Sequence, residues 1–180
     1  SPSHTLTNDT KCMLAVFQSV SYCRRRYGKN SIGSFIVSNC HGVDDVMAAL
    51  LLGSWGDLRD SAGHIRLDVT PLFETVSELS QGPGIVRQML QDETYKNHLQ
   101  GRQNKQTVMI GNSEYSTEGS FMSSRWALHW TQNMLIKIFD DADINATIFH
   151  GRSGNSVRDG KAESVNYGRL HATENGEAVN

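Results

Sequence analysis

The chain has 180 residues, of which 38% are hydrophobic, and its formal net charge is −2 at pH 7. This length indicates one domain and is too short for a complete eight-stranded α/β barrel. The charge gives no basic excess typical of nucleic-acid-binding proteins, and no apolar run is long enough to span a membrane. We therefore expect a globular protein that binds neither nucleic acid nor membrane, with a frayed segment at residues 1–10 and a single α/β domain at residues 11–180.

The cysteines and the N-terminal residues of the chain indicate the cellular compartment. The three cysteines, Cys12, Cys23 and Cys40, are an odd number without CxxC spacing, which favours reduced thiols. Residues 1–4 have neither the basic nor the apolar segment of a secretory signal peptide. Both features predict a cytoplasmic protein.

The first half of the chain alternates between helix and strand patterns. A helix is expected over residues 9–27, because Leu14, Phe17 and Val20 share one face. The arginines at positions 24–26 are interpreted as its solvated end. The next elements are a buried strand over residues 31–38, an apolar helix over 44–52 that Gly53 ends, and a strand over 66–74 in which Pro71 marks a bend or an edge.

The second half continues the alternation. Residues 75–99 are predicted to be helical in two pieces, broken at positions 82–84, and strands are predicted over 107–111 and 145–150. Between these strands lies a helix with an apolar residue at every fourth position, which we interpret as a stripe facing the core: Met122, Trp126, Trp130, Met134 and Ile138. A fifth strand is expected to begin over residues 168–173.

The repeat of strand and helix, roughly 35–40 residues per unit, is typical of a parallel sheet with right-handed crossovers. The predicted fold class is therefore α/β: a partial TIM-type (β/α)8 barrel of about four to five βα units. Half a barrel leaves open edges, here near residues 31–38 and 168–173. These edges favour self-association, so a homo-oligomer is expected.

Two acidic residues, Glu74 and Glu114, follow successive apolar strands. If those strands are neighbours, their ends lie about 5–10 Å apart, and two carboxylates at that range can share a Mg²⁺ ion. An acid after a strand more often caps the next helix, and Glu74 stands just before Thr75 at such a position. Spacing alone slightly favours capping and leaves the metal site open.

A glycine-containing loop over residues 150–160 carries His150, Arg152 and Arg158. Glycines let the backbone approach an anion, and two arginines offer bidentate forks to phosphate or carboxylate. The Walker and dinucleotide-binding spacings are absent. The loop is either a flexible surface segment or a site for a small oxyanion. Together with the carboxylates it suggests a divalent cation beside an anion pocket, suited to phosphoryl or carboxyl chemistry on a small acid.

Two sequence blocks are specific enough to indicate a family: PLFET at residues 71–75 and FHGR at residues 149–152. Further similar stretches lie at residues 31–38, 45–52, 101–103 and 108–111, and TENGE at residues 173–177 is similar to a TEQGE segment. In these blocks and their order the chain resembles the phosphoenolpyruvate carboxylase family.

The resemblance implies part of that family's eight-stranded barrel and a reaction in which phosphoenolpyruvate and bicarbonate give oxaloacetate and phosphate, with Mg²⁺ or Mn²⁺. It implies that Glu74 is one metal ligand and that Glu114 stands where the family has its second, an aspartate. His150 and Arg152 match the histidine and arginine of the family's phosphate and carboxyl-transfer region, and Arg158 matches the second arginine of its glycine-rich loop, so the resemblance implies catalytic roles for all three. Ser113 and the same two arginines match the substrate-binding positions.

Several positions depart from the family pattern. Thr117 stands where the family has a lysine, Asp159 places an acid beside Arg158, and the segment before Thr173 is shortened. These departures leave open a second hypothesis, a non-catalytic relative that acts as a binding or scaffold module. Under either hypothesis, we expect little or no carboxylase activity from the 180-residue chain alone.

Overall fold

The computed structural model describes residues 6–111, 118–151 and 164–167. Helices and strands alternate in these residues. The helices are α1 (Asn8–Tyr27), α2 (Val43–Trp55), α3 (Val76–Gln91), α4 (Glu93–Gly101) and α5 (Glu118–Asp141). The strands are β1 (Ser34–Val37), β2 (Asp68–Phe73), β3 (Lys105–Gly111), β4 (Asn145–Gly151) and β5 (Ser164–Tyr167). No helix of this described part is long and apolar enough to cross a membrane.

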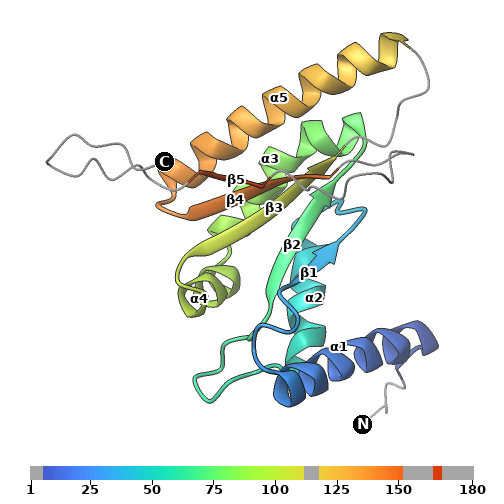
Figure 1. The fold of residues 1–180 in the computed structure, drawn as a ribbon, viewed down its shortest axis with the longest axis vertical. Helices are drawn as coiled ribbons and strands as arrows, with labels where there is room; N and C mark the ends of the chain where they lie inside the picture. Colours follow the sequence, from blue (N-terminus) through green and yellow to red (C-terminus); the bar gives the residue numbers. More distant parts are fainter. Residues whose placement is uncertain (1–5, 112–117, 152–163, 168–180) are drawn as a thin grey trace, which may run out of the picture.

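The strands form one sheet in chain order, β1-β2-β3-β4-β5, within the described residues (Figure 1). Strands β1 to β4 run parallel to one another, which confirms the α/β class and the partial-barrel arrangement. Strand β5 lies outside the ranges in which strands were predicted; it runs antiparallel to β4 and therefore needs no crossover helix. The strand predicted over residues 168–173 lies outside the described residues.

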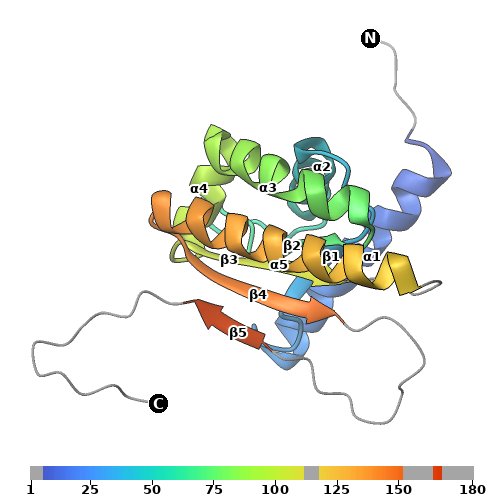
Figure 2. The same ribbon diagram turned by 90° about the horizontal axis from the view of Figure 1, so that it is seen from above.

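Helices α2, α3 and α5 lie on one side of the strands, and α1 lies beyond β1 (Figure 2). The α1 end of the molecule is joined to the sheet through Phe17, whose ring centroid is 4.5 Å from that of Phe35 in β1. Phe17 is fully buried, together with Leu79 of α3 and Phe139 of α5. The core therefore lies between the sheet and these helices.

Strand β1 is not the buried strand that its apolar run predicts. Its residues alternate between exposed and half-buried, and Ile36 is 48% exposed, because β1 is the edge strand of the described sheet. Pro71 does not mark an edge strand, since β2 lies between β1 and β3. Pro71 is the last residue of β2 paired with β1, and pairing with β3 begins at Leu72. Proline has no backbone N–H, and Pro71 thus stands at the position where β2 stops pairing with β1 and begins to pair with β3.

Two predicted helix ends are wrong for the same reason, which is tertiary packing at a glycine. Helix α2 continues past Gly53 to Trp55, and Gly53 packs where a Cβ would lie 3.2 Å from Ile65. Helix α3 continues through Gly82 to Gln91, and the break comes at Asp92. The Asp92 side chain accepts a hydrogen bond from the backbone N–H of Tyr95 at 3.0 Å and so caps α4.

The apolar stripe of α5 does not face the core along its length. Met122 and Trp126 are 70% and 68% exposed, and the Trp126 ring stacks on Trp130 with centroids 6.4 Å apart. The buried face is instead formed by Ser124, Ala127, Thr131, Leu135, Ile138 and Phe139. Four-residue steps overshoot a turn of 3.6 residues, so the predicted stripe drifts around the helix. Only its last member, Ile138, reaches the core.

Candidate active site

The carboxyl ends of β2, β3 and β4 lie in register and form one rim of the sheet. Phe73 pairs with Ile110, which pairs with His150, and Gly111 pairs with Gly151. Glu74 comes one residue after Phe73 and is therefore level with the two glycines. We call the set Glu74, Gly111, His150 and Gly151 the carboxyl rim.

The carboxylate of Glu74 is not used to cap the following helix. Thr75 caps α3 by accepting a hydrogen bond from the Glu78 N–H at 3.1 Å, and the Glu78 carboxylate accepts one from the Glu74 N–H at 2.8 Å. The capping role that spacing slightly favoured for Glu74 is therefore wrong. The Glu74 side chain is half-buried, and it makes no hydrogen bond or ion pair with any described residue. A partner-free carboxylate in this position is available to a ligand.

Close packing at the ends of β3 and β4 leaves no room for a side chain at positions 111 and 151. A Cβ on Gly111 would lie 3.1 Å from the carbonyl oxygen of Gly151 and 3.9 Å from Cγ of Glu74. The stem of Glu74 therefore leans over the end of β3. A Cβ on Gly151 would lie 2.8 Å from Cε of Met109. A side chain at either position would therefore displace Met109 or the end of β4, next to the Glu74 carboxylate.

His150 lies on the same rim but on the other side of the sheet. By strand alternation it shares a face with Ile110 and Phe73, and Phe73 packs against α3. Glu74 shares the opposite face with Met109 and Gly151. Strand β3 separates the two residues, so their backbones are two strand spacings, roughly 10 Å, apart. The imidazole and the carboxylate therefore flank the end of β3 from its two sides.

The remaining residues of the predicted site, Ser113, Glu114, Arg152 and Arg158, lie outside the described residues. Within the residues that are described, no group of three or more His, Cys, Asp or Glu side chains could hold a metal ion. Glu74 fits a hard divalent cation as a single, partly buried oxygen ligand. A complete site for Mg²⁺, which prefers oxygen ligands, needs more than this one side chain.

A second charged cluster, at the opposite end of the strands, was missed in the sequence. Arg102, which follows α4, donates from Nε to Oδ1 of Asp68 at the start of β2, at 2.5 Å. Charged residues stand at the first positions of β2 and β3, Asp68 and Lys105, and this pattern is the signal available in the sequence. We call this end of the sheet the amino rim.

Four parallel strands alternating with helices, with an acid and an imidazole at the carboxyl ends of the strands, are typical of barrel-type α/β enzymes, whose chemistry lies at that rim. The family profile described as phosphoenolpyruvate carboxylase matches residues 1–166. The chain therefore belongs to the phosphoenolpyruvate carboxylase family, as its motifs predict.

The alignment with each individual relative covers most of this chain but only a part of the relative's own length. Phosphoenolpyruvate carboxylase of Xanthomonas oryzae pv. oryzae is 38% identical over 174 residues, which is 92% of this chain and 19% of the relative. The enzymes so named from Azoarcus sp. and Mycobacterium avium are 29% and 30% identical, over 99% and 92% of the chain. The chain spans about a fifth of the length of these curated relatives.

Proposed function

We propose that the chain supplies the carboxyl rim of a phosphoenolpyruvate carboxylase site, where phosphoenolpyruvate and bicarbonate give oxaloacetate and phosphate. The observation that carries the proposal is the half-buried carboxylate of Glu74, which has no partner among the described residues and lies in the PLFET block of a family member. Because the chain spans about a fifth of its relatives, we expect the full reaction, in the cytoplasm, only where the remaining parts of the enzyme are joined to it.

A divalent cation, Mg²⁺ or Mn²⁺, is proposed to bind Glu74 and Glu114. When bound, it would stabilise the negative charge that develops on the substrate oxygen during carboxyl transfer. Glu74 offers its oxygens from a rigid point, because the α3 cap formed by Thr75 and Glu78 fixes the backbone on either side of it. Glu114 is one methylene longer than the aspartate of the family pattern. Mg²⁺ demands near-ideal octahedral geometry, so we expect Mn²⁺ to bind better than Mg²⁺.

The organic substrate is proposed to bind through Arg152 and Arg158, whose guanidinium forks match phosphate and carboxylate oxygens. The hydroxyl of Ser113 would add one further hydrogen bond. His150 is proposed to assist carboxyl transfer by exchanging a proton or a hydrogen bond with the bicarbonate-derived group.

The metal site is tested by titrating Mn²⁺ into wild type, Glu74→Gln and Glu114→Gln in a calorimeter. Loss of one charged oxygen ligand is expected to weaken Mn²⁺ binding roughly tenfold or more in each variant. Glu93→Gln is the matched control, because Glu93 is exposed, pairs with Lys96 and lies at the start of α4. Equal binding by wild type, Glu74→Gln and Glu114→Gln would refute the carboxylate pair.

Catalysis is tested by bicarbonate-dependent oxaloacetate formation, on this chain and on a longer natural version. We expect little or no product from the 180-residue chain and Glu74-dependent product from the longer one. The non-catalytic hypothesis rests on Thr117 and Asp159, which depart from the family pattern. It would be supported if the longer chain bound Mn²⁺ through Glu74 and formed no oxaloacetate.

A further inference from the structure

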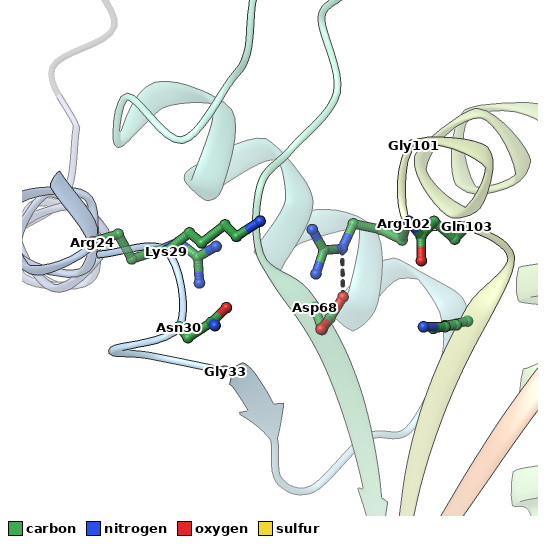
Figure 3. Close-up of a pocket in the computed structure, with 9 residues that line it drawn as sticks. Arg24, Lys29, Asn30, Gly33, Asp68, Gly101, Arg102 and Gln103 are labelled. Carbon is green, nitrogen blue, oxygen red and sulfur yellow. Dashed lines mark hydrogen bonds and ion pairs between the residues drawn. The ribbon is translucent and has the colours of Figure 1, made fainter. Parts of the chain in front are cut away.

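The amino rim of the sheet carries a cavity of about 420 Å³, on the opposite end of the strands from Glu74 and His150 (Figure 3). Its walls come from the end of α1, the loop before β1, the start of β2 and the turn between α4 and β3. The lining residues are Arg24, Lys29, Asn30, Gly33, Asp68, Gly101, Arg102, Gln103 and Lys105.

The charges in this cavity do not balance. Four of the lining side chains are cationic, and Asp68 is the only acid among the described lining residues. The carboxylate of Asp68 is already engaged, since it accepts the 2.5 Å hydrogen bond from Arg102. The side-chain ammonium groups of Lys29 and Lys105 make no hydrogen bond or ion pair with any described residue. The cavity therefore keeps a positive excess that a bound anion would offset.

The surroundings of Arg24 contain part of this excess of positive charge. Burial lowers the pKa of its guanidinium first, the positive charge of Arg102 lowers it further, and Asp68 opposes the effect. Arg24 nevertheless stays fixed, because Nη1 donates to the carbonyl oxygen of Ile32. The arginine triplet at the end of α1 is thus not merely solvated, as the sequence suggested, since its first member forms part of a cavity wall.

The cations approach from different sides. Lys29 and Arg102 extend toward each other across the start of β2, with Asp68 below them and Arg24 beside Lys29 (Figure 3). Donors that converge from several sides can each meet a different oxygen of a tetrahedral phosphate, whereas a carboxylate presents two oxygens in one plane. Gly33 adds no bulk, and a Cβ there would meet nothing within 4 Å.

We propose that the cavity at the amino rim is a binding site for a small phosphate-bearing anion, held by Lys29, Arg102 and Lys105. Its volume falls within the range of small-molecule sites and leaves room for an organic group beside the phosphate. Strand β3 spans seven residues, or roughly 20 Å at about 3.3 Å per residue, so such an anion cannot touch Glu74. The site would therefore serve a ligand other than the one bound at the carboxyl rim.

The test is calorimetric titration of the purified chain with methyl phosphate, inorganic phosphate and succinate, with amide chemical shifts recorded in parallel. We expect saturable millimolar or tighter binding of a phosphate, with shifts at Asn30, Gly33 and Gly101. If methyl phosphate binds more tightly, the preferred ligand is a phosphate ester; if inorganic phosphate binds more tightly, it is the free anion. Either result supports the site. Succinate binding as tightly as both phosphates would overturn the phosphate assignment.

The residues are tested with the double variant Lys29→Gln/Lys105→Gln. Neither lysine side chain has a partner among the described residues, so the fold is expected to be unchanged, and phosphate binding is expected to weaken roughly tenfold or more. The matched control is Lys11→Gln/Lys137→Gln, which removes the same charge from exposed positions on α1 and α5 that do not line the cavity. Equal weakening in both double variants, or no saturable binding by wild type, would overturn the proposal.

Discussion

The hydroxyl of Thr131 in α5 donates a buried hydrogen bond to the carbonyl oxygen of Leu79 in α3, at 2.7 Å. Leu79 precedes Pro83 by four residues, and proline has no N–H to donate to that carbonyl. Thr131 therefore satisfies the acceptor that Pro83 leaves open. One hydroxyl both permits a proline inside α3 and joins two of the helices that cover the sheet.

This relationship predicts the effect of Thr131→Val. The substitution keeps the shape of the side chain and leaves the Leu79 carbonyl without its donor, so the free energy of unfolding should fall by about 1–3 kcal/mol. In a Pro83→Ala background the new N–H can donate to the same carbonyl, and Thr131→Val should cost less there. Urea unfolding of the two single variants and the double variant measures the coupling. Additive losses would contradict the link.

The two glycines that flank Pro83 should respond to alanine in opposite directions. A Cβ at Gly82 would lie 2.9 Å from the Phe73 ring, whereas a Cβ at Gly84 would meet nothing within 4 Å. Gly82→Ala should lower the free energy of unfolding by about 1–3 kcal/mol through overpacking. Gly84→Ala should raise it by about 0.5–1 kcal/mol, because glycine is costly inside a helix. Changes of the same sign, measured by chemical unfolding, would contradict this account of α3.

Local sequence patterns predicted the order of elements but not their ends. Each of the strands β1 to β4 is a short apolar run next to a helical pattern, so their alternation is visible without tertiary information. The helix break predicted from glycine and proline at positions 82–84 is wrong. The Phe73 ring packs against Gly82, and the Thr131 hydroxyl supplies the hydrogen bond that Pro83 cannot donate, and both residues are distant in the chain. The prediction that β1 is buried was also wrong, since an apolar run does not reveal which strand lies at the edge of the sheet.

The site was partly visible in the sequence. The position of Glu74 at the carboxyl rim follows from its place just after an apolar strand. The capping alternative could have been dismissed, because Thr75 and Glu78 form the Thr-x-x-Glu pattern of a capping box. The cavity at the amino rim was not predictable in the same way, because it joins Arg24 of α1 to Lys105 of β3, far apart in the chain.

The three thiols should differ in reactivity. Cys12 is exposed and Cys23 is half-buried, whereas Cys40 is fully buried. Burial, followed by the charge of Asp45, raises the pKa of the Cys40 thiol to about 11. Since the thiolate is the reactive form, Cys40 should react with a disulfide reagent only as the chain unfolds. The measurement is the rate at which the thiols react with the disulfide reagent, in native buffer and in urea. Cys12→Ser is the control for the fast phase. A fast phase that persists in Cys12→Ser/Cys23→Ser would contradict it.

The buried imidazole of His98 should make stability depend on pH. His98 is 5% exposed, and its Nδ1 has no hydrogen-bond partner in the described part of the molecule. Burial, followed by the positive charge of Arg102, lowers its pKa to about 4, and Asp68 opposes the effect. An unfolded histidine has a pKa of about 6.5, so between these two values the unfolded chain binds the proton more readily. The stabilising effect of a neutral His98 is therefore full above about pH 6.5 and is lost as the pH falls toward 4.

The size of this effect follows from about 1.4 kcal/mol per pKa unit, which gives a loss of order 2–3 kcal/mol between pH 7 and pH 4.5. His98→Gln removes the titrating group and should lose correspondingly less over that interval. Carboxylates titrate in both proteins, so the difference between the two pH dependences isolates the imidazole. Urea unfolding of wild type and variant at pH 7, 6, 5 and 4.5 supplies the measurement. Parallel curves for the two proteins would show that His98 titrates normally in the folded state and would overturn the prediction.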